Sequence, residues 1–237
     1  MYYLATLMGR DDVPGAEPGS PEFEAEVAQY AAFDEAVGEV VAGGAALYPS
    51  AESRQIRRLN GQVLVTDGPF VEHAEVVGGF YVFDVENLDQ VIELARQLPA
   101  AADGTIELRP IAVYTPHDVP NADWWMALLW ETPEAVIAPD TPAWDSAAAD
   151  HQRFGEQYAE AIRGGGALHP PSDATTLRVR EGRLQLTDGP YPEFAEVIDG
   201  LYLFAAPDRA AATEIAIRIP VSDTGRTELR QVVDLGE

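Results

Sequence analysis

The sequence predicts an α+β protein built from two copies of one domain, each with helices on one face of a largely antiparallel sheet. Three observations predict this fold class. The chain repeats itself at a shift of 121 residues, which indicates a duplicated unit. Within a copy, apolar patterns typical of strands and helices follow one another in an α+β order. One strand, "GFYVFDV", is apolar on both faces.

The repeat covers most of each half. The stretch "GGAALYP" (43–49) aligns with "GGGALHP" (164–170), and "TDGPFVEHAEVVGGFYVF" (66–83) aligns with "TDGPYPEFAEVIDGLYLF" (187–204). Near the ends, "GTIELRPI" matches "GRTELRQV", and "YYLATLM" lies beside "WWMALLW" with the register slipped by one. The stretch "YTPHDVPNAD" suits a linker because of its prolines and polar residues. We predict domains at 1–115 and 123–237, joined by 116–122, each able to form its own core.

The elements are justified in order along the first copy. Residues 2–8 are an aromatic-rich apolar run, typical of a strand. Apolar residues at helical spacing over 22–42 predict a helix that Gly43 and Gly44 would end. The dipeptide Asn60-Gly61 favours a tight hairpin turn between strands at 54–59 and 62–66. A strand at 77–85, a helix at 87–98 and a strand at 105–114 complete the copy.

The strand at 77–85 predicts how the copies associate. Phe80 and Val82 point to the opposite side from Tyr81 and Phe83, and both sides are apolar. Because helices cover only one face of such a sheet, a second sheet is expected against the other. The tandem copy supplies it.

Composition excludes several classes of function. Forty acidic against fifteen basic residues give a net charge of −25, which repels nucleic acid and anionic lipid. Cysteine is absent and every basic residue is arginine, which excludes thiol catalysis, disulfides and lysine Schiff bases. No apolar run approaches a membrane helix, and "MYYLATLMGRDD" does not look like a signal peptide. We expect a cytoplasmic protein that binds neither nucleic acid nor membrane.

These motifs resemble those of the YCII-related family in its DGPF branch. The resemblance is carried by "TDGPF", the following Glu72 and Glu75, "GGFYVF" and "GTIELRPI", and it covers nearly all of both copies. It implies two ferredoxin-like (βαββαβ-type) domains that form an intramolecular dimeric α+β barrel. Such a pseudo-dimer can associate with a second chain into a further homodimer. The functions it implies are cofactor-independent breakdown of small molecules with a His-Asp pair, or regulation beside an extracytoplasmic-function sigma factor.

The catalytic candidates are His151, Asp188 and His169. His151 falls in the apolar stripe of "WDSAAADHQRFGEQYAEAI", so its imidazole should face the sheet. Single-domain relatives of YCII type carry a histidine on the same helix. His169 in "GALHPP" and Asp188 in the second DGP loop would complete a base with an orienting carboxylate if they share a cleft. The alternatives are a satisfied core histidine, an exposed loop histidine and an aspartate that caps its own turn.

Tyrosines and carboxylates are candidates for substrate contacts. Tyr30 and Tyr48 stand where the second copy has His151 and His169, and Tyr158 lies on the same stripe as His151. Asp67 opens the first DGP loop, and its alternative role is to cap that turn.

Two acidic pairs and two Glu-x-Arg motifs complete the candidates. Glu193 with Glu196, like Glu72 with Glu75, would place two carboxylates at a cleft mouth, unless they are plain surface acids. Arg230 shares a strand face with Glu228, as Arg109 does with Glu107, which favours an ion pair at the barrel seam over an arginine that orients a substrate carboxylate or enolate.

No metal or cofactor is expected from the sequence. Neither His-x-His nor His-x₃-His spacing occurs, and such spacings are typical of metal sites. Residues 164–166 are glycines that we expect to end a helix, whereas a phosphate loop would open one.

Two functions remain open. The first is a cofactor-independent lyase or isomerase that abstracts a proton from a small aromatic or carbonyl-bearing metabolite, with His151 as base, Asp188 orienting it, and Tyr30 or Tyr158 polarising a carbonyl. The second is a non-catalytic ligand-binding or regulatory module, with a sigma factor as a partner and structural histidines.

Overall fold

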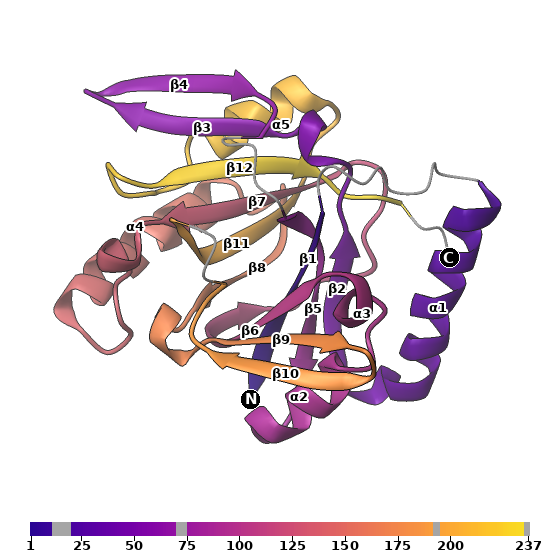
Figure 1. Ribbon diagram of the computed structural model, residues 1–237. Coiled ribbons are helices and arrows are strands. Elements are labelled where there is room, and N and C mark those ends of the chain that lie inside the picture. The colour runs from indigo at the N-terminus through magenta and orange to yellow at the C-terminus, as the bar shows by residue number, and fades with distance from the viewer. Residues whose placement is uncertain (11–19, 70–74, 192–194, 235–237) are drawn as a thin grey trace.

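In a computed structural model of the chain, the two halves share one twelve-stranded antiparallel sheet (Figure 1). The structure describes residues 1–10, 20–69, 75–191 and 195–234. The strand path is β2-β5-β1-β6-β8-β11-β7-β12-β3-β4, and β9 pairs with both β10 and β6.

The two halves have the same order of elements, except that α3 of the first half has no counterpart among the described residues of the second. The first half holds β1 (Tyr2–Arg10), α1 (Pro21–Val37), β2 (Val41–Ala46), β3 (Arg54–Leu59), β4 (Gln62–Asp67), β5 (Glu75–Asp84), α2 (Leu88–Ala95), α3 (Ala100–Asp103) and β6 (Thr105–Thr115). The second half holds β7 (Trp124–Glu131), α4 (Pro142–Gln157), β8 (Ile162–Leu168), β9 (Thr175–Arg180), β10 (Arg183–Asp188), β11 (Val197–Ala205), α5 (Arg209–Ala216) and β12 (Arg226–Gln231). The predicted α+β tandem repeat is confirmed.

The predicted hairpin is found as β3 and β4. Its turn residues Asn60 and Gly61 have φ angles of 51° and 75°, the positive values that this type of turn requires. In the second half, Glu181 and Gly182 form the equivalent turn between β9 and β10, with φ angles of 51° and 72°.

The predicted end of the first helix is wrong. α1 ends at Val37, and Gly43 and Gly44 lie inside β2. Residues 164–166 likewise lie inside β8 rather than at the end of a helix. A Cβ on Gly165 would lie 2.5 Å from the Leu201 carbonyl oxygen of β11. Gly44 and Gly165 therefore allow close approach of neighbouring backbones, a role that glycine also has within strands, and Gly43 leaves room for the side chains of His117 and Tyr114.

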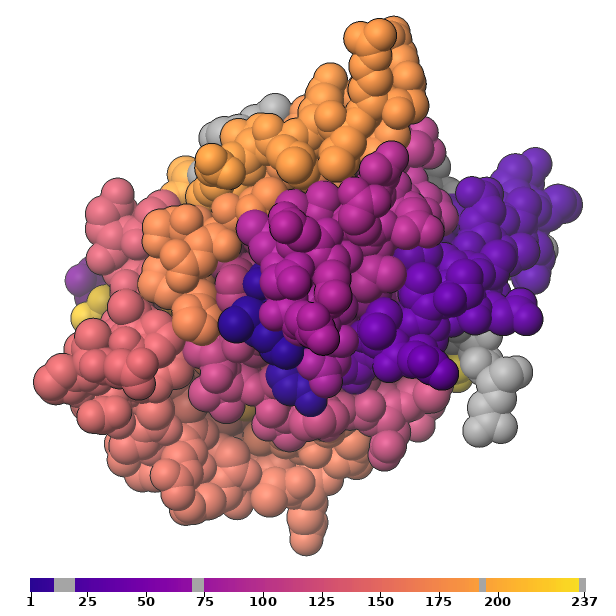
Figure 2. Space-filling view, turned by 90° about the horizontal axis from the view of Figure 1, so that it is seen from below, coloured from indigo at the N-terminus to yellow at the C-terminus, as the bar shows by residue number. Residues whose placement is uncertain are grey.

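Each half lends a hairpin to the sheet of the other. β3 pairs with β12, with Arg57 opposite Arg226, and β9 pairs with β6, with Leu177 opposite Ile106. Figure 2 shows the β9–β10 hairpin (orange) alongside the segment of α2 and α3 (magenta). There Arg180 donates hydrogen bonds to three backbone carbonyls at the end of α3. The tandem copies thus form an intramolecular pseudo-dimer.

The sheet closes into a barrel at two seams between the halves. At one seam β6 pairs with β8, with Ile111 opposite Leu168. At the other seam Leu47, just after β2, forms a bridge with Val232, just after β12. The predicted dimeric α+β barrel is therefore confirmed.

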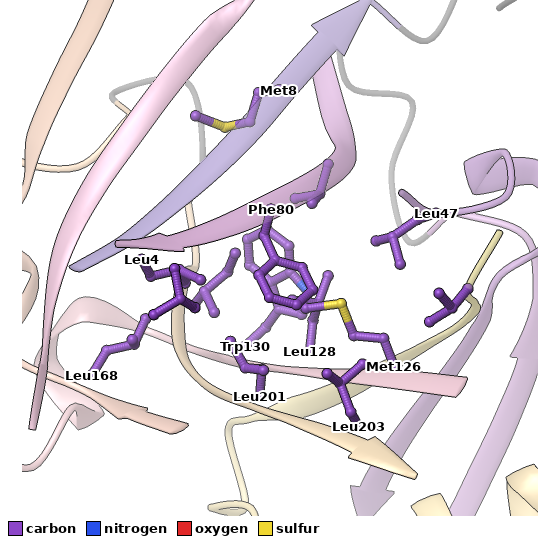
Figure 3. Close-up of a cluster of buried hydrophobic side chains, with 14 of the residues drawn as sticks. Leu4, Met8, Leu47, Phe80, Met126, Leu128, Trp130, Leu168, Leu201 and Leu203 are labelled. Carbon is purple, nitrogen blue, oxygen red and sulfur yellow. The ribbon is translucent and has the colours of Figure 1, made fainter. Parts of the chain in front are cut away.

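Apolar side chains from both halves fill the barrel (Figure 3). Phe80 and Val82 of β5 point into it, whereas Tyr81 and Phe83 point to the helices, as the alternation predicts. The buried members of this core are Leu4, Met8, Leu47, Val77, Phe80, Val82, Ile111, Trp124, Met126, Leu128, Trp130, Leu168, Tyr191, Ile198, Leu201, Leu203 and Val232. Because both halves contribute, removal of this surface from water stabilises their association.

Helices α1 and α4 lie on the outer face of the sheet, one in each half, and bury little surface. Each has one buried residue, Phe33 in α1 and Phe154 in α4. The tyrosines beside these helices, Tyr30, Tyr81, Tyr158 and Tyr202, are half-buried. Within the described residues, no helix is both long and apolar enough to cross a lipid bilayer.

Candidate functional site

His151 of α4 faces the sheet, as its place in the apolar stripe predicts. Its Nδ1 lies 2.9 Å from the hydroxyl oxygen of Tyr202 on β11, and the two rings stack with centroids 5.9 Å apart. Phe154 packs against the same tyrosine, edge to face at 5.1 Å. Burial lowers the pKa of His151, so the imidazole is neutral at pH 7 and can accept a proton.

The first half has tyrosines at the equivalent place. Tyr30 occupies the position of His151, and its ring stacks on Tyr81, the counterpart of Tyr202, at 6.4 Å. Burial raises the pKa of Tyr30 to about 12, and burial also raises the pKa of Tyr81, which interacts with Asp34. These phenols stay protonated at neutral pH. The same location therefore offers an imidazole in one half and phenols in the other.

Tyr158 belongs to the layer around His151. It follows α4 directly, and its ring lies 5.0 Å from that of Phe154. The aromatic layer between α4 and β11 thus contains two sequence candidates, His151 and Tyr158, together with Tyr202, which sequence reasoning did not single out. Tyr202 lies in "GLYLF", whose inward and outward positions alternate, but nothing in that stretch shows that α4 would pack over it.

Asp188 and His169 lie in other surroundings. Asp188 ends β10 opposite Thr175 and is exposed. His169 follows β8, and its Nδ1 lies 3.5 Å from an Asp173 carboxylate oxygen. Within the described ranges, no contact joins either residue to His151. The catalytic roles of Asp188 and His169 stay predictions without a contact to support them.

Three of the substrate-binding candidates make structural contacts, and one lies outside the described residues. The Asp67 carboxylate lies 3.0 Å from Arg54 and 2.9 Å from Arg209, which joins the β3–β4 hairpin to α5. Arg230 is buried, and its Nε donates a hydrogen bond to the Tyr48 carbonyl at 2.9 Å. Glu193, like Glu72, lies outside the described residues.

The second DGP loop docks on the first half. Glu107 pairs with Arg109, both buried on β6, and its Oε2 accepts a 2.9 Å hydrogen bond from the backbone N–H of Tyr191. Gly68 and Gly189 have φ angles of 84° and 98° in the two loops, which explains glycine at this position of the motif. The expected ion pair at the seam is present and holds the loop.

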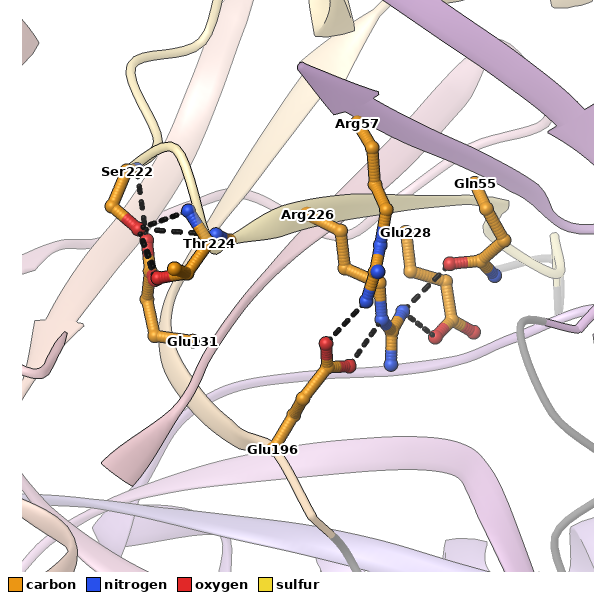
Figure 4. A network of polar contacts seen from close by, with 9 residues as sticks. Gln55, Arg57, Glu131, Glu196, Ser222, Thr224, Arg226 and Glu228 are labelled. Carbon is orange, nitrogen blue, oxygen red and sulfur yellow. Dashed lines mark hydrogen bonds and ion pairs between the residues drawn. The ribbon is translucent and has the colours of Figure 1, made fainter. Parts of the chain in front are cut away.

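A buried network around Arg226 joins the halves at the equivalent place (Figure 4). The guanidinium donates to Glu196 at 2.6 Å and to Gln55 at 2.6 Å, and it lies 4.5 Å over the Trp130 ring. Glu196 also pairs with Arg57 of β3. Glu196 is therefore part of an ion network and not a plain surface acid.

Asp199 is a titratable residue that the sequence reading missed. Burial raises its pKa to about 6, the neighbouring Glu131 adds to the rise, and Arg109 opposes it. A carboxyl that titrates near neutral pH is typical of functional sites, although ion networks also produce such shifts. The available signal was the mismatch within the repeat, because Gly78 occupies this position in the first half.

His117 of the linker is a third residue that the sequence did not single out. Its ring packs edge to face against Phe80 and Trp124, each at 6.0 Å, and burial lowers its pKa. A Cβ on Gly43 would lie 2.5 Å from its Nε2. The linker histidine thus fills space at the junction of the halves, and no periodicity in the sequence could have placed it there. Among the described residues, His, Asp and Glu side chains form no group of three or more suited to a metal ion.

Comparison with known proteins gives a family and distant structural likenesses. The model of the YCII-related domain family matches residues 1–115 and 124–236. An uncharacterised protein of Rhizobium meliloti (strain 1021) is 38% identical over 79 residues, which are 32% of this chain and 64% of that protein.

Two solved structures match most of this chain with TM-scores below 0.5. A candidate chlorite dismutase is 11% identical with a TM-score of 0.43, and the match covers 98% of this chain and 94% of that one. A heme-binding protein from Thermus thermophilus is 10% identical with a TM-score of 0.42, and the match covers 98% and 91% of the two chains.

Proposed function

Since the chain belongs to the YCII-related domain family over both of its halves, we propose that it is a cofactor-independent enzyme that moves a proton on a small aromatic or carbonyl-bearing metabolite at His151. The two DGP loops, with their spacing to the following strands, support membership of the DGPF branch within the same proposal. The observation that carries the proposal is the 2.9 Å contact between His151 Nδ1 and the Tyr202 hydroxyl.

The geometry suits a general base with an adjacent hydrogen-bond donor. When Nδ1 carries the imidazole proton, its N–H donates a hydrogen bond to the Tyr202 oxygen. Nε2 is then left as the proton acceptor. Burial raises the pKa of Tyr202 to about 12, so the phenol keeps its own proton for a substrate carbonyl oxygen. The C–H proton passes to Nε2 and the electron pair moves to the oxygen as an enolate. Return of the proton to another carbon gives isomerisation, and loss of a leaving group gives elimination.

The test is proton exchange in D₂O. The protein is incubated with a panel of small ketones, lactones and hydroxyaromatic acids, and deuterium incorporation is followed by NMR. His151→Gln should slow exchange of a responding compound by about 100-fold or more, the usual contribution of a positioned base. Tyr202→Phe should slow it less.

The matched control is Tyr30→Phe at the equivalent position of the first half, which should leave exchange unchanged. Equal losses for Tyr30→Phe and His151→Gln would refute a site in the second half. Absence of exchange above the buffer rate for every compound would refute the enzyme.

A second candidate function is a non-catalytic ligand-binding or regulatory module, including one that partners a sigma factor. It is favoured by the contacts of Asp67, Arg230 and Glu107, which hold the halves together. The two functions differ in the response of the ¹⁵N-labelled His151 imidazole to the same panel. Shifts of its resonances by a compound that gains no deuterium support the binding module.

A further inference from the structure

The halves carry matching buried ion clusters that differ in one cation. The Arg226 cluster comprises Gln55, Arg57, Glu196, Arg226, Glu228 and Arg230. The Thr105 cluster comprises their repeat counterparts Thr176, Arg178, Glu75, Thr105, Glu107 and Arg109. The Arg226 cluster contains three arginines and two glutamates, whereas these counterparts include two arginines and two glutamates. Arg10 lies opposite Glu75 in the β1–β5 register.

In the Arg226 cluster the guanidinium of Arg226 lies between the acceptors (Figure 4). It contacts Glu196 Oε2 at 2.6 Å, Gln55 Oε1 at 2.6 Å and Glu228 Oε2 at 3.3 Å. Arg230 shares Glu228 at 3.0 Å. These carboxylates therefore accept two guanidinium groups at once.

The Thr105 cluster has a counterpart of the contact between Glu196 and Arg57, but within the ranges described it has no counterpart of the contact between Glu196 and Arg226. Glu75 Oε1 lies 3.8 Å from Arg178, as Glu196 Oε1 pairs with Arg57. Glu75 Oε2, the counterpart of the atom that accepts from Arg226, is buried and has no hydrogen-bond partner in the described part of the chain. The Thr105 hydroxyl is also buried without a hydrogen-bond partner among the described residues, and Thr105 is 0% exposed. Buried polar groups without partners are rare and costly.

Smaller side chains stand where Arg226 and its stacking partner would be. Thr105 lies opposite Met8 in the β1–β6 register, and Arg226 lies opposite Trp130 in the β7–β12 register. Both members of the first-half pair are thus smaller than their counterparts. The Glu75 side chain is 11% exposed and Arg178 is 32% exposed, which places one side of the cluster close to solvent.

We propose that the Thr105 cluster binds a small organic cation with a guanidinium or amidinium group. This cation lies between Glu75 and Thr105, at the place that corresponds to the Arg226 guanidinium in the other cluster. The planar group supplies N–H donors to Glu75 Oε2 and to the Thr105 hydroxyl oxygen. The net charge of −25 attracts cations to the protein. This site lies apart from His151, so it stands or falls independently of the proposed enzyme.

The test uses the full chain and methylguanidinium chloride, with sodium chloride at equal ionic strength as the reference. Calorimetry and NMR should show saturable binding to the wild type. Glu75→Gln should weaken it by about tenfold or more, the scale of a lost charge-assisted hydrogen bond. Thr105→Arg should abolish it, because the introduced side chain occupies the site.

The twin cluster supplies the positive control. Arg226→Thr removes the natural guanidinium, and methylguanidinium should raise its melting temperature and bind with one additional equivalent. A wild type that responds no more than in sodium chloride overturns the proposal, since water then fills the site. Unchanged binding in Glu75→Gln overturns it too, and this variant decides the matter if Thr105→Arg does not fold.

Discussion

Asp199 shows how one difference between the repeats alters the electrostatics of a strand. Its counterpart Gly78 has no side chain, whereas Asp199 is half-buried near Glu131, and burial raises the pKa of its carboxyl to about 6. In the unfolded chain the carboxyl has its ordinary pKa of 3.8. Between these values the folded state binds more protons than the unfolded state. Stability is therefore lost as the pH rises from 3.8 to 6, and the loss persists above 6.

Replacement of this carboxyl should stabilise the protein at neutral pH. We expect Asp199→Asn to raise the free energy of unfolding at pH 7 by about 1 to 2 kcal/mol, a discounted value for a partly solvated group. The gain should shrink as the pH falls through 6 toward 3.8. Urea unfolding at several pH values measures it, with the exposed Asp188→Asn as control. An equal gain at pH 4 and pH 7 would rule out the charge as the cause.

The pair of Glu107 and Arg109 permits a second prediction at this scale. Glu107→Leu leaves Arg109 buried without its carboxylate and should cost about 3 to 5 kcal/mol. The double variant Glu107→Leu with Arg109→Met removes both charges and should recover a large part of that loss. Denaturant unfolding of the two variants measures the difference. A double variant no more stable than Glu107→Leu would show that the hydrogen bond from Tyr191, rather than the buried charge, sets the cost.

At the scale of elements, glycines have opposite roles in helices and strands. Gly155 lies in α4, and a Cβ there would meet nothing within 4 Å. Gly165 lies in β8, where a Cβ would lie 2.5 Å from the Leu201 backbone oxygen. The same substitution should therefore act with opposite sign at the two positions.

We expect Gly155→Ala to stabilise the protein by about 0.5 to 1 kcal/mol, because glycine is a poor helix former. Gly165→Ala should destabilise it by about 1 to 3 kcal/mol, because β8 and β11 must move apart. Thermal unfolding of both variants and the wild type under one condition measures the two stability changes. A neutral Gly165→Ala would show that the strands can separate without loss of pairing.

For the whole molecule, exchange of hairpins couples the folding of the two halves. β3 pairs with β12 and β9 pairs with β6 across the halves, and the barrel core draws on both. A half alone would expose its inner sheet face and an unpaired strand edge, which favours association.

Separated halves should therefore not persist as folded monomers. We expect residues 1–118 and 119–237, expressed as separate chains, to form a 1:1 complex on mixing, and each half alone to be unfolded or self-associated. Light scattering after gel filtration gives the masses, and amide NMR spectra report folding. A dispersed spectrum from a monomeric half would contradict the coupling.

The sequence by itself determined the duplication, the strand and helix order, and the packing of the two copies face to face around a common core. These follow from local patterns, because the repeat, the Asn60-Gly61 turn and the alternation along β5 depend on neighbours in the chain. The inward orientation of His151 was predictable for the same reason. Gly43 and Gly44 were misread because glycine after an apolar helix is typical of a helix end, and only the strand packing shows their true role.

Only the tertiary structure decided which side chains meet. Tyr202 reaches His151, Tyr191 reaches Glu107, and Glu196 reaches Arg226 across separations of 51, 84 and 30 residues. Packing of α4 over β11 sets the first contact, and docking of the second DGP loop on β6 sets the second. The third belongs to the network that joins β12 to β3, and no spacing along the chain encodes any of them. The shifted pKa of Asp199 has the same origin, because burial and neighbouring charges exist only once the halves have closed on each other.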